Sequence, residues 1–251
     1  MTDIQQLATT LDDAVRDVRA IAPLTDAGPL DVTDAYRVQR AVVARRKARG
    51  ERIIGVKMGF TSRAKMVQMG VDDVIWGLLT DTMLVESRLD LGGLIQPRIE
   101  PEIAFLIGSP VRSVADADAA VAGVAVGYEV LDSRYRDFAF TLPDVIADNA
   151  SAAAFGVGSW HDPHDLGGIA NIGLVMEIEG RLTQTGSSAA ILGDPMRSLR
   201  AAARLAEQAG IPLEPGWVVL AGAATAAVPL PRDAHVRVTA AGLGSVEVTT
   251  A

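Results

Sequence analysis

Apolar residues at the start of the chain recur with the spacing of an α-helix. The first series follows Thr2, a candidate N-cap, and consists of Ile4, Leu7, Leu11, Ala14, Val15 and Val18. A second helix, with Asp31 or Thr33 as its cap, is predicted to end before Gly50. Each helix has one apolar stripe, so we expect residues 1–50 to form a helical cap that packs on the rest of the chain.

From residue 52 onward the pattern changes to short segments typical of β-strands. Strands are predicted at residues 53–59, 76–81, 97–107, 124–132, 155–157, 172–178, 217–220, 236–239 and 245–248. Helices are expected at residues 61–66 and 116–122, and between Asp194 and Gly210. Because the strands do not alternate strictly with helices, the pattern favours an α+β fold, a mixed β-roll or barrel, over a doubly wound sheet. Residues 51–251 are expected to form one compact β-roll domain.

The strand at residues 97–107 carries two glutamates on one face. Side chains alternate between the faces of a strand, so Glu100 and Glu102 lie on the same side, roughly 6–7 Å apart along it. Two carboxylates held side by side on an otherwise apolar strand repel each other and resist the loss of water. Either one of them binds a proton or a cation lies between them, and we favour the cation.

Glu129 is the candidate for a third ligand. It is a lone carboxylate in the apolar segment 124–131, where an unpaired charge would be costly to bury. Three carboxylates without Cys or His favour a hard cation, Mg²⁺ or Mn²⁺, that keeps open or water-filled positions. The alternative is a buried ion pair between Glu129 and Arg98 or Arg134.

Lys57 is a second unusual residue, because it lies inside a predicted strand between Gly55 and Gly59. The glycines permit close approach of a ligand or of another backbone segment. Next to a metal, Lys57 could bind a substrate carboxylate or act as an acid or base with a lowered pKa. The alternative is a surface lysine on an edge strand. Asp81 is either an acid that assists this site or a turn residue.

Two further patterns carry weaker signals. His161 and His164 are separated by Asp-Pro, which predicts a surface loop rather than a metal-binding helix. Residues 222–225, Gly-Ala-Ala-Thr, follow a strand and could present backbone amides and a hydroxyl to an anion.

Composition narrows the class of protein. The 251 residues have a formal net charge of −8 and no cluster of Lys and Arg interleaved with aromatics, so nucleic acid is not an expected partner. The absence of cysteine excludes disulfides, thiolate metal sites and cysteine nucleophiles. No apolar run approaches the roughly 20 residues needed to cross a bilayer, and the first residues lack a signal-peptide pattern. We therefore expect a soluble, cytoplasmic protein without a membrane partner.

Five motif blocks resemble those of a known family. They are KMGFTS at 57–62, GLLTDTM at 77–83, PRIEPEIAF at 97–105, EVLDSR at 129–134 and ADNAS at 147–151. In this order they resemble the fumarylacetoacetate hydrolase superfamily, in its branch of 2-hydroxypentadienoate hydratases and 4-oxalocrotonate decarboxylases. The resemblance covers nearly the whole chain.

The resemblance implies a fold and a set of site residues. It implies a mixed β-roll, a Mg²⁺ or Mn²⁺ site at Glu100, Glu102 and Glu129, and Lys57 and Asp81 as catalytic groups. Substrate contacts are expected from Ser62, Leu79, Gln96, Arg134, Asn149, Ser151 and Thr225.

Within that branch, the segments SRAKMVQM at 62–69 and RYRDF at 134–138 look more like those of the decarboxylases. We therefore expect a lyase of meta-cleavage aromatic catabolism that decarboxylates 4-oxalocrotonate (2-oxo-3-hexenedioate) to 2-hydroxypenta-2,4-dienoate. The alternatives are a 2-hydroxypenta-2,4-dienoate (2-keto-4-pentenoate) hydratase and a non-catalytic partner subunit of such an enzyme. The expected partners are a small α-keto acid or dienol, together with a hydratase or further copies of the chain.

Overall fold

The computed structural model describes residues 2–251, apart from the side chains of residues 68 and 69. The helices are α1 (Ile4–Arg16), α2 (Val32–Ala48), α3 (Arg63–Met69), α4 (Leu142–Ala147) and α5 (Pro195–Ala209). The strands are β1 (Ile53–Gly59), β2 (Ile75–Thr80), β3 (Arg88–Leu89), β4 (Arg98–Ile107), β5 (Val121–Leu131), β6 (Ala152–Val157), β7 (Gly173–Ile178), β8 (Arg181–Ser187), β9 (Val218–Ala223), β10 (Val228–Pro229), β11 (His235–Ala240) and β12 (Gly244–Thr250). Among the described residues, no helix has the length and apolarity needed to cross a membrane.

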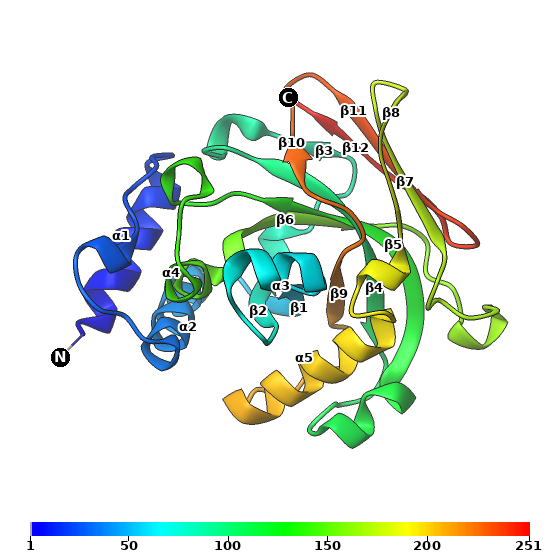
Figure 1. Ribbon diagram of the computed structural model, residues 1–251, viewed down its shortest axis with the longest axis horizontal. Coiled ribbons are helices and arrows are strands. Elements are labelled where there is room, and N and C mark those ends of the chain that lie inside the picture. The colour runs from blue at the N-terminus through cyan, green and yellow to red at the C-terminus, as the bar shows by residue number, and fades with distance from the viewer. Residues whose placement is uncertain (1) are drawn as a thin grey trace.

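The larger sheet is curled and mixed, and it carries most of the predicted site. Its strand order is β2-β1-β9-β4-β5-β6, and the short β10 pairs with the beginning of β4. Strands β1 and β9 run parallel, while the other neighbours along the path are antiparallel. The long strands β4 and β5 curve through the centre of the molecule (Figure 1). This arrangement confirms the expected α+β roll.

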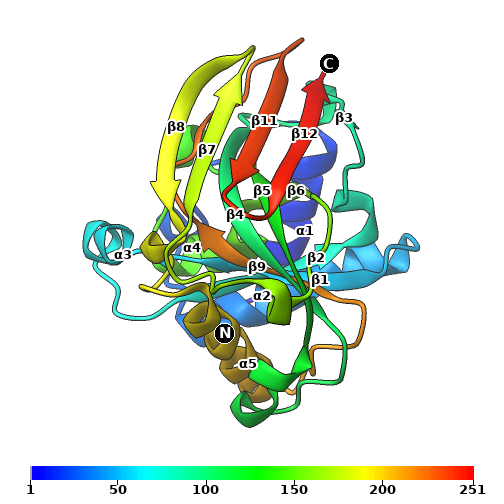
Figure 2. The same cartoon turned by 90° about the vertical axis from the view of Figure 1, so that its right-hand side faces the viewer.

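A smaller antiparallel sheet covers one side of the larger one (Figure 2). Its order is β3-β12-β11-β7-β8, with only β3 added in parallel. Residues of β11 alternate between buried and exposed, as expected for a sheet with one face in water. The buried Val236 and Val238 belong to the same apolar core as Ile103 and Val126 of the larger sheet. The main core therefore lies between the two sheets.

Helices α1, α2 and α4 form a second apolar cluster at one end of the molecule (Figure 1). Asp12 of α1 is almost fully buried and forms ion pairs with Arg45 and Arg49 of α2. Gln39 of α2, also buried, donates hydrogen bonds to the carbonyl oxygens of Trp76 and Ile146. The predicted cap thus packs together with α4, a later segment, and contacts β2 directly.

Several local predictions were wrong. The N-cap of α1 is Asp3, not Thr2, since the Asp3 carboxylate accepts a hydrogen bond from the backbone N–H of Gln6. The helix expected at residues 116–122 is two 3-10 turns followed directly by β5. There the carboxylate of Asp116 accepts backbone N–H groups and so stabilises a turn instead of a helix. Helix α4 and strand β8 were not predicted.

Gly156 of β6 leaves room for the ring of Tyr128 on the neighbouring strand β5. The two residues are cross-strand partners, and a Cβ at Gly156 would lie less than 3.0 Å from three atoms of that ring. The ring is buried, so it has little space to move. We expect Gly156→Ala to lower the free energy of unfolding by about 1–3 kcal/mol, measured by chemical denaturation. Gly28→Ala is the control, because no atom lies within 4 Å of its added Cβ, and equal effects of both changes would contradict this contact.

Candidate active site

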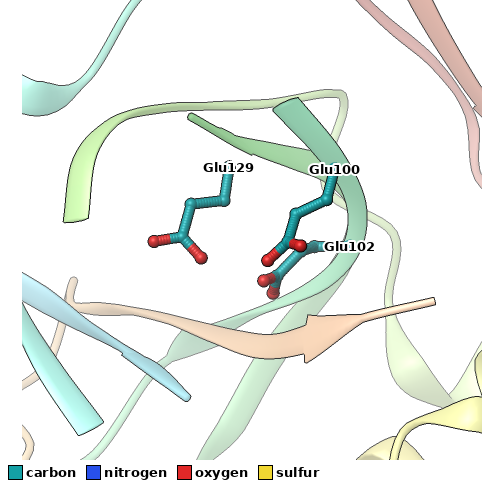
Figure 3. A group of neighbouring side chains, drawn as sticks. All are labelled: Glu100, Glu102 and Glu129. Carbon is teal, nitrogen blue, oxygen red and sulfur yellow. The ribbon is translucent and has the colours of Figure 1, made fainter. Parts of the chain in front are cut away.

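The three glutamates lie on one face of neighbouring antiparallel strands. Glu100 and Glu102 extend from β4, and Glu129 of β5 is the direct cross-strand partner of Glu100. One carboxylate oxygen of each lies within 4.8 Å of those of the other two, and the three groups point toward one another (Figure 3). Glu102 and Glu129 have no accessible surface, and Glu100 is partly buried. The predicted convergence of these three side chains is therefore present.

A bulge in β9 aims one backbone amide at this group. The pairing of β4 with β9 is irregular between Glu102 and Ala104, and Gly222 adopts a φ of 109° there. In this conformation the Gly222 N–H donates a 2.7 Å hydrogen bond to Glu102 Oε2. A Cβ at Gly222 would overlap the side chain of Thr61, so a glycine is required. The amide expected to meet an anion in residues 222–225 thus meets a carboxylate of the protein itself.

Burial sets the protonation of the glutamates. It raises the pKa of Glu100 to about 8, with a further rise from the charge of Glu129, while Lys57 and Lys65 oppose the shift. Burial and the other two carboxylates raise the pKa of Glu102 well above its usual range. The pKa of Glu129 is raised by burial and held down by Lys57. Without a cation, the group therefore retains protons near neutral pH.

Lys57 of β1 is the buried counter-charge of this group. Its Nζ lies 3.0 Å from Glu129 Oε2 and donates a 3.0 Å hydrogen bond to the carbonyl oxygen of Ala150. Burial lowers the pKa of Lys57, but the charges of the three glutamates outweigh it and the net shift is upward. This upward shift belongs to the metal-free site, whereas the lowered pKa expected from the sequence applies to Lys57 next to a bound metal and stays a prediction. With two of its N–H groups engaged, the ammonium has one left for a ligand.

A strained turn holds the carbonyl group that Lys57 contacts. Asn149, Ala150 and Ser151 all have positive φ values, between 51° and 59°, which is costly for residues with a Cβ. The Asn149 amide is paired with the backbone of Leu78, through a donor and an acceptor bond of 2.8 Å each. A Cβ at Gly77 would lie 2.5 Å from the Asn149 carbonyl oxygen, so this close approach also depends on a glycine. The turn is fixed against β2 and orients Lys57.

One cavity of about 560 Å³ contains Lys57 and Glu100. Of the residues expected to bind substrate, Ser62, Ser151 and Thr225 line it. Other parts of its wall come from aromatic side chains, Phe60, Phe138 and Phe140, and from the small residues of segment 223–227. The cavity has therefore a charged inner end and a largely apolar wall.

The structure does not bring the other expected residues to this cavity. Asp81 lies beyond the end of β2, where it forms an exposed ion pair with Arg52. Leu79 is fully buried in an apolar cluster with Phe155. Gln96 donates to two backbone carbonyl oxygens, those of Ser133 and Tyr135.

Two more of the expected substrate contacts serve the protein itself. Arg134 forms a buried ion pair with Asp148, and its guanidinium also donates to the Asp148 carbonyl oxygen. This pairing, together with that of Lys57, removes the alternative in which Glu129 is neutralised by an arginine. The Asn149 amide is used by Leu78, as described above. His164 lies in an exposed 3-10 turn, and the half-buried His161 forms an isolated β-bridge with Val124 of β5, so the two histidines do not share a helix, as predicted.

Two cations that line the cavity were not predicted as site residues. Arg98 belongs to β4, and its guanidinium carbon lies 4.2 Å from the centroid of the Phe138 ring. Lys65 reaches the cavity from α3. The signal for Arg98 was in the sequence, because residues 98, 100 and 102 share one face of a strand.

Two of the glutamate oxygens lack a partner within the part of the chain that the structure describes. Glu102 Oε1 and Glu129 Oε1 are buried and have no hydrogen-bond partner among the described residues. Buried polar atoms are normally satisfied, so two orphaned carboxylate oxygens side by side indicate a missing partner. Three converging carboxylates favour a cation as that partner, and an all-oxygen set suits a hard divalent cation. The residues present fit Mg²⁺ or Mn²⁺.

Comparisons with known proteins agree with this geometry. The family model described as fumarylacetoacetate (FAA) hydrolase C-terminal matches residues 53–251. A 4-oxalocrotonate decarboxylase of Pseudomonas sp. is 50% identical over 252 residues, which cover 98% of both chains. A 2-hydroxyhexa-2,4-dienoate hydratase of Comamonas testosteroni is 34% identical over 261 residues, covering 99% of this chain and 98% of the hydratase.

A solved structure extends the likeness to three dimensions. The 4-oxalocrotonate decarboxylase of Pseudomonas putida G7, complexed with magnesium and adipate, superposes with a TM-score of 0.95 at 36% identity. The match covers 100% of this chain and 99% of that one. Sequence, fold and the arrangement of acidic residues lead to one conclusion: the chain belongs to the fumarylacetoacetate hydrolase family.

Proposed function

We propose that this protein is a metal-dependent lyase that decarboxylates 4-oxalocrotonate to 2-hydroxypenta-2,4-dienoate. The observation that carries the proposal is the convergence of three carboxylates with Lys57, at a place where Glu100 and Lys57 line one cavity. The 50% identity to a 4-oxalocrotonate decarboxylase supports the choice of substrate.

Glu100, Glu102 and Glu129 would hold the metal, Mg²⁺ or Mn²⁺. When bound, such a metal would supply Lewis-acid chemistry, which stabilises the negative charge that develops on the 2-oxo oxygen of the substrate. The Gly222 amide fixes Glu102 in its orientation, and the ion pair with Lys57 fixes Glu129. The protein thereby positions the donor oxygens before the substrate arrives.

The reaction breaks the bond between C5 and C6 and releases CO₂. The electron pair of that bond forms a C4–C5 double bond, and the pair of the C3–C4 double bond moves to C2–C3. The 2-oxo oxygen receives the charge and then one proton, which yields the dienol. Lys57 lines the cavity and has one N–H left, so it can donate a hydrogen bond to this oxygen and deliver the proton.

The apolar wall acts on the leaving carboxylate. Phe138 and Phe140 line the cavity with apolar surface, which hydrates a neighbouring carboxylate poorly. Loss of the negative charge as neutral CO₂ is favoured where the carboxylate is poorly hydrated.

A hydratase acting on 2-hydroxypenta-2,4-dienoate is the second candidate, because the inner end of the site suits both reactions. The chain is similar over its full length to a hydratase of Comamonas testosteroni, so both reactions have to be assayed. A non-catalytic subunit is disfavoured by the complete set of three glutamates with Lys57. A cytoplasmic location, and association with a hydratase or with further copies of the chain, stay predictions.

An assay with both substrates separates the two reactions. Purified protein with Mg²⁺ is expected to release CO₂ from 4-oxalocrotonate without consuming 2-hydroxypenta-2,4-dienoate. Glu100→Gln should lower the rate at least about a hundredfold, since metal charge stabilisation is worth several kcal/mol. Glu214→Gln, an exposed acid in the loop before β9, is the matched control. Addition of water to the dienoate with no CO₂ release would refute the decarboxylase.

Replacement of Lys57 tests its role as the proton donor. In Lys57→Met, kcat should fall by about 10²–10⁴-fold, the usual contribution of a proton-transfer group. Mg²⁺ binding, measured by calorimetry, should persist because the three carboxylates remain. Lys47→Met, an exposed change in α2, is the control. A Lys57→Met variant with unchanged kcat would remove this residue from the mechanism.

The stability of the metal-free protein should depend on pH, because burial raises the pKa of Glu100 from 4.5 to about 8. A carboxyl group that holds its proton more tightly when folded stabilises the fold at low pH, and this contribution is lost as pH rises toward 8. In EDTA, the difference in unfolding free energy between wild type and Glu100→Gln should therefore shift against the wild type between pH 5 and pH 8. The shift should be of the order of a few kcal/mol.

Mg²⁺ should reverse this loss of unfolding free energy with rising pH. Mg²⁺ binds the deprotonated carboxylates, so its stabilising effect on the wild type should be larger at pH 8 than at pH 5. Chemical denaturation with EDTA or with Mg²⁺ at both pH values measures the two effects. Equal stabilisation by Mg²⁺ at pH 5 and pH 8 would contradict the raised pKa.

A further inference from the structure

Arg98 places a positive charge in the cavity at a defined distance from the acidic group. It precedes Glu100 by two residues on β4, so both side chains leave the same face of the strand, roughly 7 Å apart along it. The guanidinium stacks on Phe138 and lines the cavity. Because the stacking orients the planar group, less freedom is lost when it binds an anion.

Lys65 adds a second charge from a different element. It lies on α3, which is separate from the sheet, and it lines the same cavity. Among the described residues, neither Lys65 nor Arg98 has a side-chain hydrogen bond or an ion pair with a carboxylate. The other lysine of the cavity, Lys57, is by contrast paired with Glu129. Within the described part of the chain, Lys65 influences Glu100 through its charge but forms no ion pair with it, and Arg98 forms none either, so both cations are available to an anionic ligand.

The charges of the site match a ligand with two negative charges. Three carboxylates carry three negative charges, which Lys57 and a divalent cation balance. Arg98 and Lys65 then leave the cavity with two positive charges in excess. An α-keto acid with one carboxylate would balance only half of this excess, whereas a dicarboxylate balances all of it.

We propose that Arg98 and Lys65 form a second anion subsite, which binds the distal carboxylate of the substrate and selects dicarboxylates. The inference rests on the proposed function, because it assumes that the other end of the ligand lies at the three glutamates. From there an extended chain that follows β4 leads to Arg98, with Lys65 facing it from α3.

The subsite acts on binding more than on the chemical step. The distal carboxylate is the group that leaves as CO₂, so its charge declines as the C5–C6 bond breaks. An ion pair that weakens on the way to the transition state lowers KM without raising kcat. Arg98 and Lys65 are therefore specificity residues, and their loss should affect KM more than kcat.

The test uses two inert ligands that differ at one end. 2-Oxoadipate carries both carboxylates, and 2-oxohexanoate has a methyl group in place of the distal carboxylate. Neither has the conjugated double bond through which electrons reach the 2-oxo group, so both bind without reaction. Calorimetry with Mg²⁺-loaded wild type should give at least about tenfold tighter binding of 2-oxoadipate.

Variants of Arg98 and Lys65 test whether these residues cause the preference for 2-oxoadipate over 2-oxohexanoate. Arg98→Met should reduce it about tenfold and the more exposed Lys65→Met about two- to fivefold, with affinity for 2-oxohexanoate unchanged. Arg98→Lys should restore part of it, and Lys47→Met is the control. With 4-oxalocrotonate, KM should rise in both Met variants while kcat changes less.

Other outcomes overturn the inference in distinguishable ways. Equal affinity of the wild type for both ligands, or an undiminished preference in both Met variants, would refute the subsite and leave the proposed function standing. Equal weakening of both ligands in the variants, or a fall in kcat at unchanged KM, would show a structural role instead. If neither ligand binds the wild type, the proposed function fails together with the subsite.

Discussion

Electrostatic repulsion among three converging carboxylates, two of them fully buried, is the constraint on which the rest of the site depends. Cross-strand pairing puts Glu100 directly opposite Glu129, and like charges in that position destabilise a sheet. The protein offsets this cost with Lys57 and the Gly222 amide, yet two buried oxygens keep no partner. The β4–β5 pair nevertheless has the longest run of paired residues in the larger sheet. A rigid scaffold thus maintains an arrangement that is unfavourable until a cation binds.

The backbone around Lys57 likewise holds a conformation that costs stability but serves the site. Three consecutive residues with left-handed backbone conformation are expensive, and only strong local contacts can maintain them. Asn149 supplies two hydrogen bonds to β2, and the Arg134–Asp148 pair stabilises the preceding residue. These polar groups therefore do not need to touch a ligand to be essential, since they fix the carbonyl that orients the Lys57 ammonium.

Much of the fold and the acidic group could be predicted, because both depend on local periodicity. A period of two places Glu100 and Glu102 together, and a lone glutamate in an apolar strand identifies Glu129. Register is different, since it depends on which strands pair, and the sequence carries no direct sign that Glu129 faces Glu100. Motif membership was also a poor guide to side-chain direction: Gln96, Arg134 and Asn149 lie in or beside the matched blocks but bind backbone or protein carboxylate. Arg98 was overlooked because an arginine beside two glutamates is readily interpreted as their ion-pair partner.

The position of the two ends of the cavity explains how one architecture can host different reactions of related acids. The inner end is built from paired strands, where any change of register would move several side chains to the opposite face. The outer end is formed by α3, by the turn around Phe138 and by segment 223–227, whose side chains can change without disturbing the sheet. Chemistry common to α-keto acids and dienols thus belongs to the sheet, whereas discrimination by charge belongs to the periphery. Arg98 connects the two ends of the cavity, because it extends from β4, the strand that also carries Glu100 and Glu102. Its guanidinium charge is thereby held at a constant distance from the carboxylates.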